Sequence, residues 1–251
     1  MNKFFVPKEN ISFNTAYIKG DDLKHIHKVL RLKEGDKVNI NNCHGKEFLG
    51  IIDSIEKDKV TVNIVEELKL YNESPVKVYL FQGMPKSTKM DLIVQKATEL
   101  GIWEVTPIIT NRVVVKGDFK EFKRVDRWNK IALEACKQCK RSIIPTVKSP
   151  IYFEELLKYL SHMDLIIVPY EMEKSVGIKK AIDSIEYTDS IGEIAIVIGP
   201  EGGFEEEEIE ELKSINSKIV TLGPRILRTE TAGFVCLTLL MYELGDLGGF
   251  C

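Results

Sequence analysis

The first 70 residues alternate apolar and polar positions in short runs, which is the pattern of half-buried β-strands. Turns around Gly35 and Gly45 separate these runs. The stretch from Asp21 to Leu30 instead begins at an acidic residue and repeats apolar residues on one side, which predicts a helix. The expected strands span residues 3–6, 37–42, 48–55 and 59–65. The pattern predicts a small β-barrel with one helix at its edge.

From about residue 75 the pattern changes to strands that alternate with helices. The continuous apolar run from Ile194 to Ile198 suits a strand covered on both faces, so a parallel sheet is expected. The expected strands are 76–84, 104–109, 165–168, 194–198 and 219–222, and the expected helices are 86–100, 119–141, 153–160, 205–215 and 229–244. We therefore predict an α/β protein with two domains, residues 1–72 and 73–251.

The composition is that of a globular protein, with 44% apolar and 29% charged residues in 251. The longest strongly apolar stretch, residues 234–240, is far shorter than the roughly 20 residues that span a bilayer. Five scattered cysteines argue against the disulfide framework of a secreted protein, and the first residues do not resemble a signal peptide. We expect a cytoplasmic protein without a membrane partner.

The net charge of −3 is unevenly distributed along the chain. Residues 73–150 carry 15 Lys and Arg against 8 Asp and Glu, whereas residues 151–251 carry 8 against 19. Because local fields decide where a polyanion docks, the middle of the chain is a candidate surface for one.

A first candidate site is the glycine-rich loop of residues 199–203, Gly-Pro-Glu-Gly-Gly, between a buried strand and an acidic helix. Its glycines let a ligand approach the backbone closely, and loops at the carboxyl ends of parallel strands are where α/β folds bind ligands. A plain strand-to-helix turn is the alternative. The sequence contains neither a G-x-G-x-x-G dinucleotide motif nor a G-K-[ST] phosphate loop here.

A second loop repeats this geometry about 20 residues later. Here Gly223 and Pro224 follow a strand, and Thr229 is a natural cap for the next helix. Arg225 and Arg228 lie between them and Glu230 directly follows Thr229, where loops normally hold function. The alternative is that the arginines only pair with the acidic helix upstream.

Taken together, residues 199–203 and residues 222–232 (Leu-Gly-Pro-Arg-Ile-Leu-Arg-Thr-Glu-Thr-Ala) closely resemble the bacterial small-subunit rRNA uridine-N3 methyltransferase family. This family belongs to the SPOUT superfamily of knotted α/β methyltransferases. The resemblance covers nearly the whole chain. Further matching residues are Lys86, residues 89–91 and 95–101, Ala135, Gln138, Arg141, Pro145, His25, and residues 29–31 and 35–36.

The resemblance implies a PUA-like β-barrel for RNA at residues 1–72 and a SPOUT methyltransferase domain with a trefoil knot at residues 73–251. It also implies that S-adenosylmethionine binds within the knotted loops and that the active site is completed in a homodimer. The apolar helix near residues 232–244 is a candidate interface element, and an ordinary core helix is the alternative. Mapped onto this sequence, the cofactor-binding residues are Pro169, Gly199, Glu201, Gly202, Leu222, Gly223, Ile226 and Leu227.

The implied reaction is methylation of a uridine in 16S rRNA, U1498 in the customary numbering, to 3-methyluridine. N3 becomes a good nucleophile only after it loses its proton, so the enzyme must remove that proton or stabilise the resulting anion. Arg225 or Arg228 would stabilise the anion, and Glu230 is the nearest candidate base. Because N3 lies on the Watson–Crick edge, the base must be unpaired or flipped out.

A basic segment from Arg112 to Lys148 is the candidate RNA surface, with 11 basic residues against 4 acidic ones. On the helix expected at 119–141, the charges form a stripe opposite an apolar face, which suits a phosphate backbone. A solvated helix face is the alternative. The candidate RNA-binding residues are Arg31, Arg112, Lys123, Arg127, Lys137 and Arg141.

No metal site is expected. Cys136 and Cys139 have metal-like spacing, but no second pair follows, and both fall on the apolar helix face. Two other functions stay open: a related knotted methyltransferase that acts on a ribose or another base, and a non-catalytic RNA-binding factor for ribosome assembly.

Overall fold

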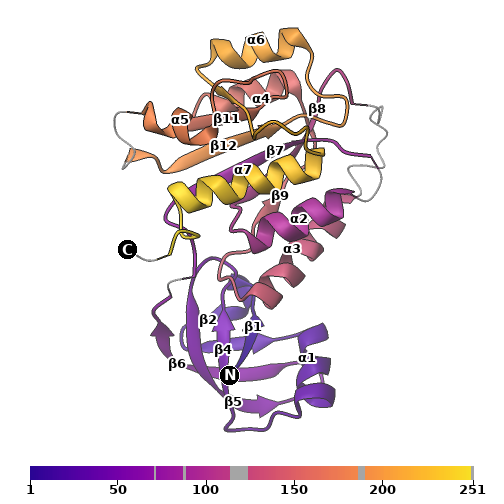
Figure 1. The fold of residues 1–251 in the computed structure, drawn as a ribbon. Coiled ribbons are helices and arrows are strands. Elements are labelled where there is room, and N and C mark those ends of the chain that lie inside the picture. The colour runs from indigo at the N-terminus through magenta and orange to yellow at the C-terminus, as the bar shows by residue number, and fades with distance from the viewer. Residues whose placement is uncertain (71, 87–88, 114–123, 186–189, 250–251) are drawn as a thin grey trace. The chain divides into compact units, whose positions relative to one another are not determined.

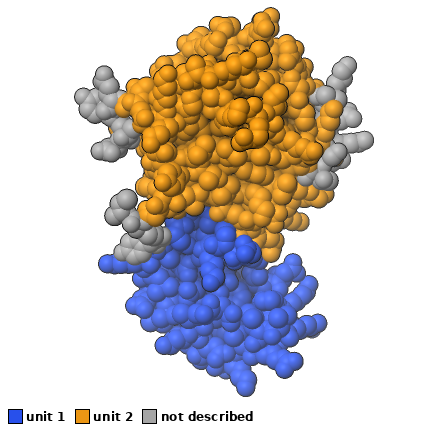
Figure 2. Space-filling model, in the orientation of Figure 1, with its two compact units in different colours: residues 1–73, 136–144 blue, residues 74–135, 145–251 orange. Residues whose placement is uncertain are grey.

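The computed structural model describes residues 1–70, 72–86, 89–113, 124–185 and 190–249. The chain forms two compact units, one of residues 1–73 and 136–144 and one of residues 74–135 and 145–251, which Figure 2 distinguishes by colour. Residues 136–144 lie outside the N-terminal domain expected from the sequence. This segment begins inside the helix Val125–Cys139, whose earlier residues belong to the second unit, so the local pattern carries no sign of the change.

The first unit is built on a six-stranded mixed sheet in the order β1-β4-β5-β6-β3-β2. Strand β1 pairs with β4 in parallel, and the other neighbours pair antiparallel. Alternate residues such as Ile18, Ile40 and Val62 point into its core and are fully buried. Its strands are β1 Asn2–Phe5, β2 Ile11–Ser12, β3 Thr15–Ile18, β4 Lys37–Asn41, β5 Glu47–Ile55 and β6 Val60–Leu68.

The helix expected after residue 20 is present, but it changes its winding halfway. Helix α1 Asp21–His25 continues into a π-helical turn, η2 Ile26–Leu30. Leu23 and Ile26 bury the apolar side, and Arg31 ends the turn in the left-handed region at φ 52°. A short 3-10 turn, η1 Lys8–Asn10, precedes β2.

Glu73 anchors the distant segment 136–144 to the first unit. Its carboxylate accepts hydrogen bonds from the Arg141 guanidinium at 2.8 Å and from the backbone N–H groups of Ser142 and Ile143 at 2.6 and 2.9 Å. Asn41 adds a side-chain bond to the Ser142 carbonyl at 3.1 Å. Arg141 is only 6% exposed and bound in this network, so it does not face solvent as the proposed RNA surface required.

The second unit contains a parallel sheet whose strands follow the order β10-β8-β7-β12-β11-β13, with β9 also pairing with β8. Residues on both faces of the central strands are buried, which explains the unbroken apolar run at Ile194–Ile198. The strands are β7 Lys77–Gly83, β8 Glu104–Ile109, β9 Thr146–Val147, β10 Ile151–Tyr152, β11 Leu165–Pro169, β12 Glu193–Ile198 and β13 Lys218–Val220.

Helices cover both faces of this sheet. Helices α4 and α6 pack on one face, where Leu156 and Leu212 meet Val197, and α2 and α7 lie side by side on the other (Figure 1). The helices are α2 Lys89–Glu99, α3 Val125–Cys139, α4 Phe153–Leu160, α5 Ile178–Asp183, α6 Glu206–Ser214 and α7 Thr229–Glu243. Among the described residues, no helix combines the length and apolar character needed to cross a bilayer.

Candidate functional site at the carboxyl ends of the parallel strands

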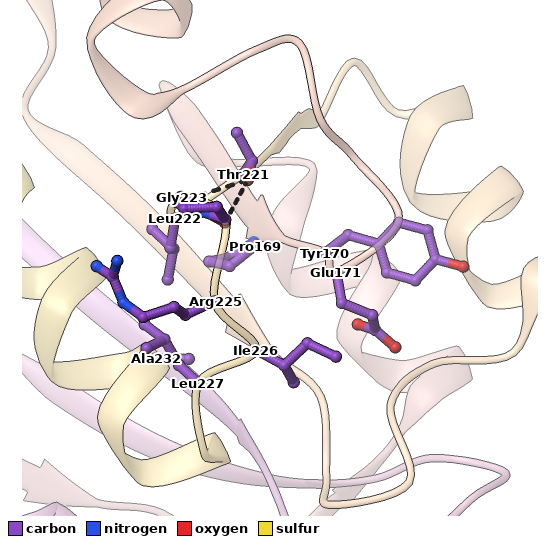
Figure 3. Close-up of a pocket in the computed structure, with 11 residues that line it drawn as sticks. Pro169, Tyr170, Glu171, Thr221, Leu222, Gly223, Arg225, Ile226, Leu227 and Ala232 are labelled. Atoms are coloured by element: carbon purple, nitrogen blue, oxygen red, sulfur yellow. Dashed lines mark hydrogen bonds between the residues drawn. The ribbon is translucent and has the colours of Figure 1, made fainter.

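Three loops meet at the carboxyl edge of the parallel sheet and enclose two adjoining cavities. They follow β11, β12 and β13, the positions at which α/β folds bind ligands. The first cavity lies between the loops after β11 and β13 (Figure 3), and the second extends to the loop after β12. Pro169, Glu171, Ile226, Leu227 and Ala232 line both.

Seven of the eight expected cofactor residues line these cavities. Leu222 and Gly223 border the first, Gly199 and Glu201 border the second, and Pro169, Ile226 and Leu227 border both. Gly202 is different. A Cβ atom added to Gly202 would lie 3.1 Å from the Arg112 Cβ atom, so this glycine packs against Arg112.

Gly223 has the geometry of a residue that leaves space for a ligand. Its φ of 106° lies in the left-handed region that favours glycine, and an added Cβ would meet no atom within 4 Å. The Thr221 hydroxyl bridges the Gly223 N–H and C=O groups at 3.2 Å each, as the dashed lines in Figure 3 show. Thr221, within the same loop, therefore fixes the conformation of the loop, and the space beside Gly223 stays open toward the cavity.

A buried hydrogen-bond relay connects the second cavity to the sheet. Gln82, fully buried at the end of β7, donates to the Thr229 hydroxyl at 2.8 Å, and Thr229 donates to the Gly199 carbonyl at 2.6 Å. An added Cβ at Gly83 would lie 2.3 Å from the Pro200 nitrogen, so β7 packs directly against the glycine-rich loop. Gln82 and Gly83 were not expected at the site, because in the sequence they look like ordinary strand residues.

Charged groups gather at the rim of the second cavity. Lys89 Nζ lies 3.1 Å from Glu201 Oε1 and 3.2 Å from Glu230 Oε2. The bond to Glu201, in spite of some desolvation, raises the pKa of Lys89. Burial opposes ionisation of Glu201, but the Lys86 N–H and the Lys89 ammonium outweigh it and lower its pKa.

Arg225 borders the first cavity and Arg228 the second. Both are exposed, and neither forms an ion pair with another described residue. The alternative, in which the two arginines only pair with the acidic helix, is therefore not seen in the described part of the chain. The acidic helix α6 pairs instead with its own neighbours, since Glu208 accepts the N–H groups of Asn111 and Glu205 at 2.9 and 2.8 Å.

Arg112 braces the glycine-rich loop from its outer side. Its guanidinium donates to the Gly202 carbonyl at 3.2 Å and to Glu205 at 2.7 Å. The bond from Arg112 lowers the pKa of Glu205. In the structure Arg112 holds the loop that follows β12, and its expected contact with RNA stays a prediction.

Comparisons with known proteins agree on one family. The model of the RNA methyltransferase domain matches residues 72–241, and that of the RNA methyltransferase PUA domain matches residues 18–65. Ribosomal RNA small subunit methyltransferase E of Bacillus subtilis (strain 168) is 37% identical, over 99% of both chains. This chain belongs to the ribosomal RNA small subunit methyltransferase E family. The predicted family is confirmed. The predicted fold class is confirmed as well: a PUA-type unit is combined with a methyltransferase unit of the SPOUT, or knotted α/β, type.

Two solved structures of similar proteins contain S-adenosylmethionine. A methyltransferase from Legionella pneumophila in complex with this cofactor is 34% identical, with a TM-score of 0.79 and 98% of both chains covered. The methyltransferase E of Neisseria gonorrhoeae, also bound to it, is 30% identical, with a TM-score of 0.81 over 98% of this chain and 99% of that one.

In this member of the methyltransferase E family, the other candidate RNA residues are spread over both units. Arg31 is exposed in the first unit, where Lys137 lies 3.3 Å from Asp22. Arg127 is 62% exposed at its side chain and pairs with Asp91 in the second unit. Lys123 lies outside the described residues. The RNA-binding assignments stay predictions.

The cysteines of this family member have structural surroundings. The Cys136 thiol is buried and donates to the Ile143 carbonyl at 3.3 Å, and burial raises its pKa to about 12. Within the described residues, no group of three or more His, Cys, Asp and Glu side chains is placed to hold a metal ion.

Proposed function

We propose that this protein transfers the methyl group of S-adenosylmethionine to N3 of a uridine in 16S rRNA, the one known as U1498, and forms 3-methyluridine. It does so in the cytoplasm, as a homodimer, on the small ribosomal subunit. The observation that carries the proposal is the meeting of two Gly-Pro loops around cavities lined by Arg225 and Arg228, with Glu230 paired to Lys89 of the cavity wall.

The cavities fit the cofactor. Apolar side chains of Pro169, Leu222, Ile226 and Leu227 suit an adenine ring, and the open side of Gly223 leaves room for a ligand against the backbone. Bound there, the cofactor supplies a methyl carbon made electrophilic by a positively charged sulfur. Family membership and the cofactor found in two similar structures support the same assignment.

The protein's part in the reaction is to generate and hold the uracil anion. The N3 proton must leave before the nitrogen lone pair forms its bond to the methyl carbon and the sulfur departs as a neutral thioether. An exposed guanidinium beside the cavity, from Arg228 or Arg225, stabilises negative charge on the uracil oxygens. Glu230, in the first turn of α7, is the candidate base that receives the proton.

The test is a methylation assay on small subunits and on protein-free 16S rRNA from a strain that lacks the gene. Digestion and mass mapping of the product should find one 3-methyluridine at U1498. A methyl group on a ribose or on another base would instead identify the protein as a related methyltransferase with a different target. Cofactor binding without any methyl transfer to either substrate would show an assembly factor and refute the proposal.

A further inference from the structure

Lys89 occupies an unfavourable position for a cation. It is the first residue of α2, where the helix dipole presents its positive end. Its ammonium nevertheless lies there, within 3.1 Å of Glu201 and 3.2 Å of Glu230. Because the helix dipole disfavours a cation at this position, a compensating interaction is expected, and the two carboxylates supply it.

Glu230 depends on this contact. Its side chain is 11% exposed, and among the described residues its buried Oε2 atom meets no hydrogen-bonding group other than the Lys89 ammonium, 3.2 Å away. A buried carboxylate without a nearby positive charge is strongly destabilised. Lys89 is the cation that the described structure places beside it, so removal of the ammonium leaves Glu230 uncompensated.

Glu201 links the same ammonium to the glycine-rich loop. Its carboxylate also accepts the Lys86 N–H at 3.0 Å, so it ties the loop after β12 to the residues that precede α2. Glu230 lies in the first turn of α7, two residues beyond Arg228. The Lys89 ammonium therefore pairs both with the loop that borders the cofactor cavity and with the helix that carries the candidate base.

We propose that Lys89 is a positioning residue of the methyl-transfer site, which acts through Glu230 by pairing with its carboxylate and holding it in place, and through Glu201 by holding the glycine-rich loop. The part that concerns Glu230 rests on the proposed function. Lys89 also borders the second cavity. Direct contact with the RNA or the cofactor is therefore the rival role, and it makes a different prediction, because such a contact works independently of Glu230.

The experiment is a double-mutant cycle with Lys89→Met, Glu230→Gln and the double variant. The single-turnover rate of methyl transfer at saturating S-adenosylmethionine and the free energy of unfolding without ligand are both measured. Lys89→Arg tests rescue by a conservative change. Lys96→Met is the matched control, since Lys96 lies on the same helix and pairs with Glu99 at 2.9 Å away from the cavities.

We expect Lys89→Met to slow methyl transfer at least tenfold in the wild-type background and less than twofold in the Glu230→Gln background. Lys89→Arg should restore most of the rate, and Lys96→Met should match the wild type. An equal loss in both backgrounds, or a wild-type rate for Lys89→Met, would overturn the proposal.

The unfolding cycle separates this proposal from the proposed function. If the wild type makes no 3-methyluridine, the proposed function fails, but a coupling between positions 89 and 230 can still be measured in stability. Additive stability changes would show that Lys89 and Glu230 do not interact, and they would overturn the proposed role of Lys89.

Discussion

Among the described residues, Arg228 and Arg225 are the exposed arginines that line the cavities, and kinetics can separate their roles. If Arg228 stabilises the N3 anion, Arg228→Ala should lose at least tenfold in single-turnover rate with little change in RNA or cofactor affinity, because the anion develops mainly in the transition state. Higher pH should partly restore the rate, since hydroxide then supplies the anion. Arg225→Ala is the comparison. A wild-type rate for Arg228→Ala would exclude this role, and an equal loss in RNA affinity would make it a phosphate contact.

Glu173 makes the loop after β11 sensitive to acid. Its carboxylate accepts the Ser175 hydroxyl and N–H, both at 2.6 Å, and the Val176 N–H at 3.1 Å. These bonds lower the pKa of Glu173 from 4.5 to about 2, and the bond from the Ser175 side chain contributes most. Because the folded-state pKa lies below the unfolded one, the bonds stabilise the fold above about pH 5, and this contribution is lost as the pH falls toward 2.

The predicted consequence is a stability difference between wild type and Glu173→Gln that depends on pH. The variant should be less stable at neutral pH, and the difference should shrink steadily below about pH 5. Urea unfolding at a series of pH values measures it. Glu171→Gln is the control, because Glu171 lies in the same loop, whereas the bonds from Ser175 and Val176 go to Glu173. A difference that stays constant down to about pH 3 would contradict the assignment.

At the scale of elements, β7 and the glycine-rich loop are in direct backbone contact. A methyl group at Gly83 would lie 2.3 Å from the Pro200 nitrogen and 2.6 Å from the Gly199 carbonyl carbon. Gly83→Ala must therefore displace the loop, which should cost about 1–3 kcal/mol in the free energy of unfolding and weaken S-adenosylmethionine binding. Denaturant unfolding and cofactor titration check both effects. Gly192→Ala, where the added methyl meets only Asp164 Oδ2 at an ordinary contact distance of 3.6 Å, should change neither one much.

Helix α3 carries the described part of the candidate RNA stripe. Trp128 and Ala132 are buried on one side, while Arg127 and Lys130 are exposed. Arg127→Gln with Lys130→Gln should weaken RNA binding and flatten its dependence on salt by about 0.7–0.9 in log–log slope for each lost phosphate contact. Lys158→Gln, an exposed lysine of α4 on the other side of the sheet, is the control. An unchanged slope would show that the stripe is only a solvated face.

The sequence predicted most elements because their patterns are long and local. The expected bounds of β8, 104–109, and of α4, 153–160, are those of the structure. The two-residue strands β2, β9 and β10 were missed because so short a run has no periodicity. Strand β3 and helix α5 were also missed, since four and six residues give only a weak pattern beside their neighbours.

The candidate site was predictable where glycine and charge stand together in sequence, as in the two Gly-Pro loops. Contacts between distant elements were not predictable. Gln82 and Lys89 reach the site only because β7, α2 and α7 meet in space. Arg141 looked like a surface cation, and only the position of Glu73, 68 residues earlier, shows that it is buried.

At the scale of the whole molecule, α7 has more apolar surface than one chain covers. The helix is apolar on all sides, and Leu237, Leu240 and Met241 pack inward. On its outer side, Leu239 is 39% and Tyr242 is 60% exposed. An exposed apolar helix face indicates an interaction surface, and in the predicted homodimer a second copy of the chain covers it.

If two copies meet at this face, Leu239→Glu with Tyr242→Glu should convert the protein to a monomer, because paired carboxylates at the centre of an apolar interface are desolvated without a counter-charge. Light scattering after size exclusion measures the mass, and the wild type should have twice the chain mass. Tyr159→Glu, an equally exposed aromatic of α4 on the opposite side of the sheet, should remain dimeric. Methyl transfer should fall together with the dimer if the site is completed across the interface. A monomeric wild type, or a variant that keeps the dimer mass, would place the interface elsewhere or remove it.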